Sequence, residues 1–322
     1  MMPFDILAIG EILVDLTQTG TNEQGVRLLA ANPGGAPANV AVAASRLGAK
    51  AAFAGCVGRD AFGRSLMETL EKDGVDLSAT AEDPEVPTTL AVVTVDARGE
   101  RSFTFYRSPG ADLQLRREQI PEELLQSARI VHFGSVSLTA QPARGAVKAA
   151  VKDARAAGAL ITYDPNYRPA LWKSESEAVE RMRAPLPMVD VLKISDEETT
   201  LLSGAQDPAQ AAKLLADQGI RLVLVTLGGQ GVYYRLGDLT GTVPGCKVKI
   251  ADTNGAGDTF FGAVLRCLAL REGLLEGLTG PELEEILRFA NRAAALTCSR
   301  PGAIPAMPTL AEVEERLKED AP

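Results

Sequence analysis

The chain has 322 residues, of which 46% are hydrophobic, and this is enough for a large buried core. Its 33 Lys and Arg residues against 42 Asp and Glu residues give a net charge of -9, and no run of basic residues stands out, so we expect no nucleic-acid binding. The N-terminus lacks the pattern of a signal peptide and no segment reaches a membrane-spanning length, so we expect a cytoplasmic protein without membrane contact.

Cysteine and histidine are too sparse to support zinc binding or Cys–His catalysis. The four cysteines lie far apart, and the single histidine, His132, stands in the apolar segment IVHFGSV, where a core strand residue is the expected interpretation. Acid–base chemistry would therefore fall to carboxylates.

Short apolar segments alternate along the chain with longer segments of helical pattern. The expected strands are FDILAIG, AAFAGCVG, ARIVHFGSV, ALITYDPN, VDVLKIS and RLVLVTLGG, and the expected helices cover 61–74, 142–158, 208–218, 256–272 and 281–298. Most of these strands are continuously apolar, as in a parallel sheet covered on both faces. The pattern predicts an α/β fold, a three-layer α/β/α sandwich with a mostly parallel central sheet, in one domain over residues 1–322.

Two regions, about 11–32 and 87–107, break this alternation. In the second region two alternating strands flank the turn at 96–99, Asp-Ala-Arg-Gly, which predicts an antiparallel hairpin. We expect these regions to form a small β-strand lid attached to the central sheet.

The first glycine-rich motif is PGGAPANVAVAASRLG at 33–48, two glycines and two prolines before an alanine-rich helix. Asn39 falls in the first turn and can aim its amide out of the helix start. A tight turn followed by a closely packed helix explains the same residues, so the motif alone leaves both interpretations open. The dinucleotide-binding pattern G-x-G-x-x-G after the first strand and the P-loop pattern are both absent.

The second motif is DTNGAGD at 252–258, directly before an apolar helix. The backbone N–H groups of Gly255, Ala256 and Gly257, with the positive end of the helix, can stabilise charge on a phosphoryl group in transfer. Asp258 can accept the proton of an attacking hydroxyl, and an ordinary aspartate pKa of about 3.9 would suffice. The alternative is that Asp258 only complements the helix dipole.

Together, the two motifs resemble the N-terminal and C-terminal signatures of the ribokinase-like (PfkB) family of carbohydrate kinases, and the resemblance extends over nearly the whole chain. The segments most similar to fructokinases within that family are FTFYRSPGADLQL, VHFGSVSL, YDPNYRPALW, LKISDEE, VTLGGQG and FANRAAALTCSRPGAIPAMPT. The ribokinase-like fold has a mostly parallel sheet between helices and a β lid over the sugar, in agreement with the pattern above.

The resemblance implies a role for each matching position. Asp258 would be the catalytic base, and Gly255, Ala256 and Gly257 would form the anion hole. Asp15, Gly34, Gly35 and Asn39 would contact the sugar, together with Arg168 and with Arg107, although a lid arginine could equally be a surface charge. The positions that would contact ATP are Thr226, Gly228, Gly231, Gly262 and Asn291, of which Asn291 could instead be a buried amide bound to backbone.

The resemblance also implies two cations. Glu198 would hold Mg²⁺ through water, although Ser195 stands where many relatives carry asparagine. Potassium would lie near Asp252, Asn254 and Gly302, coordinated by oxygens beside the anion hole. Magnesium is expected because transfer from ATP needs the charge between its phosphates neutralised.

The activity that follows is transfer of the γ-phosphoryl group of MgATP to a primary hydroxyl, with O6 of fructose as the first choice. 2-Keto-3-deoxygluconate kinase is the alternative, because its sequences share the arrangement found here as Asp164, Asn166, Arg168, Leu171 and Trp172. Asp112, beside Arg107 in the lid, would repel a carboxylate substrate if it faced the sugar. A non-catalytic sugar or nucleotide sensor is the alternative of another class. The lids of some relatives pair, so a homodimer through the lid is also an expectation.

Overall fold

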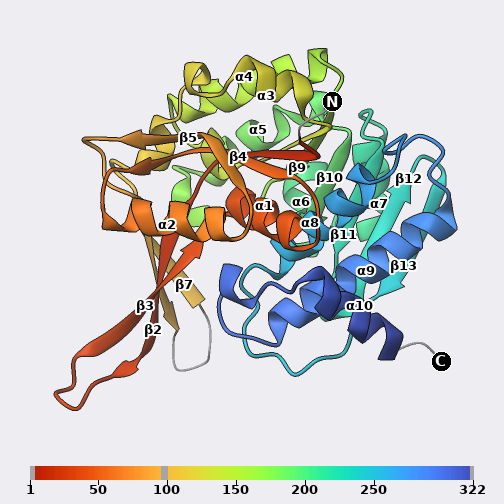
Figure 1. Ribbon diagram of the computed structural model, residues 1–322. Coiled ribbons are helices and arrows are strands. Elements are labelled where there is room, and N and C mark those ends of the chain that lie inside the picture. Colours follow the sequence, from red (N-terminus) through yellow and green to blue (C-terminus); the bar gives the residue numbers. More distant parts are fainter. Residues whose placement is uncertain (1–3, 96–100, 320–322) are drawn as a thin grey trace.

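The computed structural model describes residues 4–95 and 101–319, and its centre is a nine-stranded sheet (Figure 1). The strand order is β13-β12-β11-β10-β9-β8-β1-β4-β5. Every neighbouring pair from β11 to β5 is parallel, whereas β11 pairs with β12 and β12 with β13 in antiparallel fashion. The prediction of a mostly parallel central sheet is therefore confirmed. The bounds of its strands are β1 (Ile6–Ile9), β4 (Ala51–Gly58), β5 (Asp76–Asp83), β8 (Ile130–Gly134), β9 (Leu160–Asp164), β10 (Val191–Ser195), β11 (Leu222–Thr226), β12 (Gly231–Leu236) and β13 (Leu239–Pro244).

Helices cover both faces of this sheet, which explains why its central strands are buried along their whole length. One hydrophobic cluster joins the strands to α3 (Glu122–Ser127), α4 (Ala143–Ala156), α5 (Glu175–Arg183) and α7 (Pro208–Ala216). A second cluster joins them to α1 (Ala36–Arg46), α8 (Ala256–Ala269), α9 (Gly280–Cys298) and α10 (Leu310–Glu319). The remaining α-helices are α2 (Ala61–Lys72), which shares a third hydrophobic cluster with α1, and the short α6 (Thr199–Ser203). The predicted three-layer sandwich is confirmed.

A separate four-stranded sheet forms the lid and projects from the body (Figure 1). Its order is β3-β2-β6-β7, built from β2 (Leu13–Thr21), β3 (Arg27–Gly34), β6 (Leu90–Val95) and β7 (Arg101–Tyr106). β6 and β7 pair antiparallel, as predicted for a hairpin, while β2 pairs parallel with β6. The turn predicted at 96–99 lies outside the described residues.

The sequence pattern missed three strands of the central sheet, namely the edge strands β5 and β13 and the strand β12, which pairs with β13. β5 reads DLSATAED and β13 reads LTGTVP, and neither has the continuous apolar character of the buried strands. Edge strands have one partner and partly exposed side chains, so hydrophobicity identifies them poorly. His132 is buried in β8, and burial together with the charge of Lys193 lowers its pKa to about 3, as suits a neutral core residue.

Two glycines set the starts of the motif helices. Gly35 precedes α1 with φ 110°, and a Cβ there would lie 2.5 Å from the carbonyl oxygen of Glu11. Gly255 precedes α8 in the left-handed region with φ 73°. Within the part of the chain that the structure describes, no helix is long and apolar enough to span a membrane.

Candidate active site

The two glycine-rich motifs meet where α1 and α8 pack against each other. A Cβ on Gly262 of α8 would lie 2.8 Å from the Cβ of Ala43 and 2.9 Å from the carbonyl oxygen of Val40, both in α1. This close approach corrects the expectation for Gly262: it is a helix-packing glycine and does not line the cavity expected for adenine. By letting the helices approach, Gly262 brings their N-terminal ends together.

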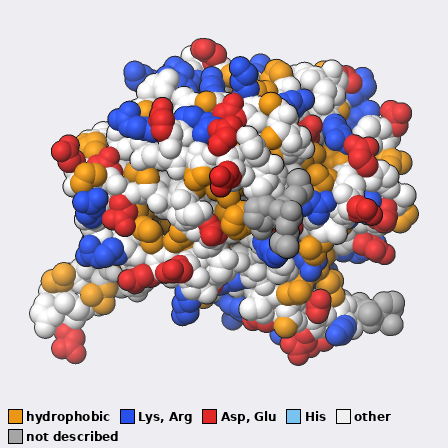
Figure 2. All heavy atoms as spheres, turned by 45° about the horizontal axis from the view of Figure 1, so that its top comes forward, with side chains coloured by type: hydrophobic (Ala, Val, Ile, Leu, Met, Phe, Trp, Pro, Cys, Tyr) orange, Lys and Arg blue, Asp and Glu red, His pale blue; other side chains and the backbone are white. Residues whose placement is uncertain are grey.

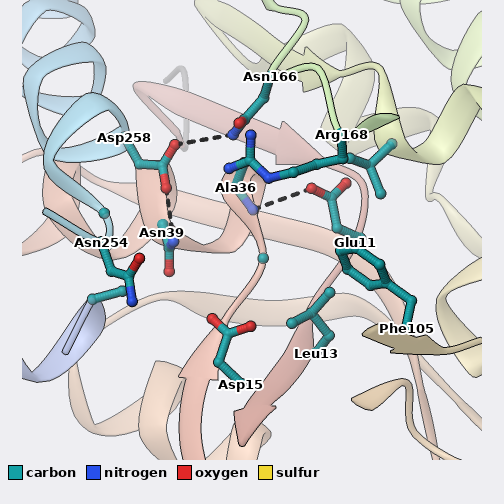
Figure 3. A pocket seen from close by; sticks show the side chains of 14 residues that line it. Glu11, Leu13, Asp15, Ala36, Asn39, Phe105, Asn166, Arg168, Asn254 and Asp258 are labelled. Atoms are coloured by element: carbon teal, nitrogen blue, oxygen red, sulfur yellow. Dashed lines mark hydrogen bonds between the residues drawn. The ribbon is translucent and has the colours of Figure 1, made fainter. Parts of the chain in front are cut away.

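A polar pocket lies at these helix ends (Figure 3). The lining residues predicted for the site are Asp15, Gly35, Asn39, Arg168, Asn254, Gly255 and Asp258, and the others are Glu11, Leu13, Ala36, Phe105, Val136, Asn166 and Ala303. The first motif, the second motif and the lid strand β7 therefore contribute to one pocket. A sugar ring could bind there, because carboxylates and amides can accept from and donate to several hydroxyls.

Asp258 lies in the first turn of α8 with its carboxylate buried and facing the pocket (Figure 3). Asn39 donates to its Oδ2 at 2.7 Å, and Asn166 donates to its Oδ1 at 3.5 Å. Burial, reinforced by the charge of Asp164, raises the pKa of Asp258 to about 6. An ordinary aspartate pKa would have sufficed for this role, and the raised pKa makes the carboxylate a stronger proton acceptor. A residue that only complemented the helix dipole would not need this enclosed position.

On the opposite side of the pocket, Asp15 occupies a space that Gly34 leaves open. A Cβ on Gly34 would lie 2.5 Å from Oδ2 of Asp15, so a larger residue would displace the carboxylate. Burial raises the pKa of Asp15 to about 6, against the opposing effect of Arg168. Four of the predicted sugar-side residues therefore line one pocket, namely Asp15, Gly35, Asn39 and Arg168, with Gly34 acting through Asp15.

Arg107 is buried, so the alternative of a surface charge is wrong, and it is not among the residues that line the pocket. Its guanidinium is buried and binds Asp112, with 2.5 Å between Nη2 and Oδ2, and it also donates to Thr139 and to the backbone oxygen of Val136. Arg107 braces the wall of the pocket at Val136. Asp112 is neutralised by this pair and does not line the pocket, so the argument for repulsion of a carboxylate substrate by Asp112 fails.

Glu11 lines the same pocket and was missed from the sequence. Its carboxylate accepts from the backbone N–H of Ala36 at 3.1 Å and from Oγ of Ser137 at 3.2 Å. Burial raises its pKa to about 7. Its position directly after the first strand was the available signal, because ligands of parallel sheets bind at the carboxyl ends of the strands.

Lys193 and Asp164 form a second feature that the sequence did not indicate. Both lie in strands predicted as core, and their side chains pair at 2.8 Å between Nζ and Oδ2 while 8% and 2% exposed. A charged pair inside apolar strand segments carries no periodic signal, so only the three-dimensional arrangement reveals it.

A second cavity lies on the other side of the start of α8. The predicted residues that line it are Thr226, Gly228, Gly231, Ala256, Gly257 and Asn291, and the others include Val248, Ile250, Phe260, Ala294 and Ala295. Its lining is largely glycine and apolar side chains, which suits a flat aromatic base. Asn291 also donates to the backbone oxygens of Val243 and Pro244 at 3.3 and 3.0 Å, as expected for a buried amide bound to backbone, and its contact with ATP stays a prediction.

The segment Gly255-Ala256-Gly257 separates the two cavities. Gly255 lines the polar pocket together with Asp258, whereas Ala256 and Gly257 line the second cavity. Backbone N–H groups at a helix start therefore lie between two cavities, one with a buried carboxylate and one with an apolar lining. This arrangement can stabilise an anion that passes from one cavity to the other.

Glu198 is held by backbone and lines neither cavity. It accepts from the N–H groups of Tyr167 and Ser195 at 2.7 and 2.8 Å, and Ser195 in turn caps the short 3₁₀ helix Asp196–Glu198. With both oxygens bound to protein, its remaining lone pairs suit a metal held through water.

Asp252 gathers the residues predicted around potassium. Its Oδ1 accepts from the N–H of Asn254 at 2.9 Å, and its Oδ2 accepts from the N–H of Gly302 at 3.0 Å. The three predicted residues are therefore together beside the anion-hole segment. Since the carboxylate is engaged by N–H groups, backbone oxygens are the donors best suited to a monovalent cation there.

Comparison with known proteins agrees with this geometry. The model of the pfkB family of carbohydrate kinases matches residues 4–310. The chain is 42% identical to fructokinase-1 of Oryza sativa subsp. japonica over 96% of both chains. Among solved structures, it matches a fructokinase of Xylella fastidiosa with bound ATP (TM-score 0.91, 35% identity, 98% of both chains) and a fructokinase of Vibrio cholerae O395 in fructose-, ADP- and calcium-bound form (TM-score 0.87, 34% identity, 98% and 99% of the chains). With its two motifs meeting at the start of α8 and this match over nearly its whole length, the chain belongs to the pfkB family of carbohydrate kinases.

Proposed function

We propose that this kinase transfers the γ-phosphoryl group of MgATP to the primary hydroxyl O6 of D-fructose, giving fructose 6-phosphate and ADP. The observation that carries the proposal is the position of Gly255-Ala256-Gly257 between the pocket of Asp258 and the second cavity. A sugar hydroxyl in the first cavity and a nucleotide in the second would face each other across these N–H groups.

In this mechanism the sugar oxygen attacks the γ-phosphorus while the bond to the bridging oxygen of ADP breaks. Asp258 accepts the hydroxyl proton, and Asn39 keeps its carboxylate aimed into the pocket through the 2.7 Å hydrogen bond. The N–H groups of Gly255, Ala256 and Gly257 stabilise the charge on the transferring group. Asp15, Gly35 and Arg168 position the sugar, and Gly34 leaves room for Asp15.

On the nucleotide side, Thr226, Gly228, Gly231 and Asn291 line the cavity proposed for ATP. The ATP in the Xylella structure and the ADP in the Vibrio structure support this assignment by analogy. Magnesium, when bound through water at Glu198, would neutralise phosphate charge. Potassium near Asp252, Asn254 and Gly302 would fix the anion-hole segment, so replacing K⁺ by Na⁺ should lower kcat.

Charge in the sugar pocket favours a neutral substrate. Its lining includes Glu11, Asp15 and Asp258 as acids, and Arg168 is the cation among the described lining residues. A sugar acid would meet more carboxylates than cations, which costs binding energy. The presence of Arg168 in the pocket is nevertheless the observation that keeps 2-keto-3-deoxygluconate as the second candidate.

The direct test combines ADP release with ³¹P NMR of the product over a panel of sugars and sugar acids. We expect fructose to give a phosphomonoester at O6 and Asp258→Ala to give none. Sugar binding without ADP release by the wild-type protein would favour the non-catalytic sensor and refute the proposal.

We further propose that the chain acts as a single kinase domain in the cytoplasm, and that its lids pair into a homodimer. Val26, Leu28 and Leu29 of the β2–β3 hairpin region are 58%, 47% and 47% exposed, and Figure 2 shows hydrophobic side chains on this projecting lobe. Covering them would bury apolar area. Light scattering of the wild-type protein should give twice the mass of one chain, and the Leu28→Asp variant should give the mass of one chain. A monomeric wild type would refute the pairing.

A further inference from the structure

A lysine lies buried beside the phosphoryl-transfer segment, and the mechanism above gives it no role. Lys193 is in β10, and its ammonium pairs with Asp164 at the end of β9 at 2.8 Å. Buried ion pairs add little net stability, because the loss of hydration offsets their attraction. Stability of the fold therefore does not explain why the buried strands β9 and β10 contain the Lys193–Asp164 pair.

The ammonium reaches the first turn of α8. A Cβ on Gly257 would lie 3.1 Å from Nζ of Lys193, so the glycine at this position leaves the space in which the ammonium lies. Gly257, like Ala256, is a residue of the anion-hole segment that lines the second cavity. Lys193 thus lies beside the anion-hole segment, next to a residue that lines the second cavity.

Three buried carboxylates act on this ammonium. Burial by itself lowers the pKa of Lys193, but Asp164, Glu198 and Asp258 outweigh it, so the pKa is raised and the lysine stays charged. In return, Lys193 opposes the rise in pKa that burial and Asp164 impose on Asp258. The other charged groups that act on Asp258 or are acted on by it are Arg168, from the loop after β9, and Asp15, from β2.

The same pair also holds the loop that carries Asn166. The Oδ1 of Asp164 accepts from the N–H of Asn166 at 3.2 Å, and Asn166 adopts φ 50°. In this left-handed conformation its amide donates to Asp258 (Figure 3). The Lys193–Asp164 pair therefore acts on Asp258 in two ways. Its charges affect the pKa of Asp258, and Asp164 orients the amide of Asn166 that donates to Asp258.

We propose that Lys193 is a positioning residue for phosphoryl transfer, whose ammonium, held by Asp164 against Gly257, balances the carboxylates around the reacting centre and keeps Asp258 in its ionised form. This inference rests on the proposed kinase mechanism. It adds a residue that touches neither sugar nor nucleotide in that mechanism but acts through Asp258.

The test compares two variants that break the same 2.8 Å pair with opposite effects on charge. Lys193→Met removes a positive charge near Asp258, so the acid limb of the kcat/KM profile should move to higher pH by about half a unit or more. Asp164→Asn removes a negative charge with nearly the same shape, so the limb should move to lower pH. Lys213→Met, which breaks an exposed pair between Lys213 of α7 and Asp217 just after that helix, is the matched control and should leave the limb in place.

A structural role alone predicts another pattern. In that case Lys193→Met and Asp164→Asn would both lower activity, with acid limbs that stay at the wild-type pH or move in the same direction, and the proposal would be overturned. Circular dichroism and thermal melts verify folding, and if Lys193→Met does not fold, the direction of the shift in Asp164→Asn alone decides. Lys193→Arg, which keeps the charge, should retain the wild-type limb.

Failure of this inference differs visibly from failure of the proposed function. The inference fails if the wild-type protein phosphorylates sugar but the acid limbs of Lys193→Met and Asp164→Asn do not move in opposite directions. The proposed function fails if the wild-type protein does not phosphorylate sugars at any pH.

Discussion

The two cavities on either side of the start of α8 are built from different chemistry. The sugar pocket is lined by ionisable and amide side chains, among them Glu11, Asp15, Asn39, Arg168 and Asp258. The cavity proposed for the nucleotide is lined mainly by glycines and apolar side chains, with few polar side chains such as Thr226, Lys247 and Asn291. On the proposed function, sugar recognition would depend on a few ionisable and amide side chains, whereas nucleotide binding would depend mainly on the shape of an apolar cavity. Substitutions should therefore have large effects in the first cavity and small effects in the second.

The largest effect is expected for Asp258→Ala. Removing the proton acceptor should lower kcat by about 10²–10⁴-fold, while the dissociation constants of sugar and nucleotide change little. Steady-state kinetics together with calorimetric titration of each ligand would separate the two. A variant that kept more than about a tenth of the wild-type kcat would remove Asp258 from the role of base. Asp217→Asn, at an exposed position, is the control.

Next in size is the effect of Asp15→Ala on sugar binding. Loss of a buried carboxylate that binds hydroxyls should raise KM for the sugar by about 10- to 100-fold. KM for ATP should stay near the wild-type value, because Asp15 does not line the nucleotide cavity. Equal increases in both constants would show that the residue acts through the fold instead of through the pocket.

The pH dependence of kcat/KM is expected to reflect the enclosed position of Asp258. Burial raises its pKa to about 6, and the ionised carboxylate is the form that accepts a proton. Activity should therefore increase as pH rises through about 6 and fall about tenfold for each unit below it. A profile still level down to pH 4.5 would contradict the elevated pKa. Burial also raises the pKa of Asp15 to about 6, so the pH profile of Asp15→Asn is needed as a control. If the acid limb of kcat/KM reflects Asp258, it should remain in this variant.

The smallest effect is expected in the nucleotide cavity, from Asn291→Ala. Its amide binds the backbone oxygens of Val243 and Pro244, so the loss should disturb the wall of the cavity and raise KM for ATP by about three- to tenfold. KM for the sugar should not change. An effect as large as that of Asp15→Ala would break the contrast between the two cavities.

The contrast also explains what could be predicted from the sequence. The strands of the parallel sheet were found because burial on both faces leaves continuous apolar runs, as in β4 and β8. The polar edge strands β5 and β13 lack that signal. Asn39 and Asp258 were found because they stand in glycine-rich motifs, and Asp15 was found through the resemblance to the carbohydrate kinase family.

Other site features depend on contacts between distant segments. Arg107 was expected to reach substrate or solvent, but Asp112, Thr139 and Val136 enclose it. Gly262 was assigned to the adenine cavity, although its lack of a side chain serves the contact between α8 and α1. Spacing along a helix shows that a small residue is needed without showing which neighbour requires it.

The central claim is that this site phosphorylates a neutral ketose, and kcat/KM for fructose and for 2-keto-3-deoxygluconate, measured side by side, tests it most directly. Both substrates offer a ketone and a terminal hydroxyl, but the second brings a carboxylate into a pocket lined by Glu11, Asp15 and Asp258. We predict that fructose is preferred by at least about tenfold, which needs only ~1.4 kcal/mol of differential transition-state binding. A preference for 2-keto-3-deoxygluconate would leave the kinase mechanism in place and contradict the assignment of fructose.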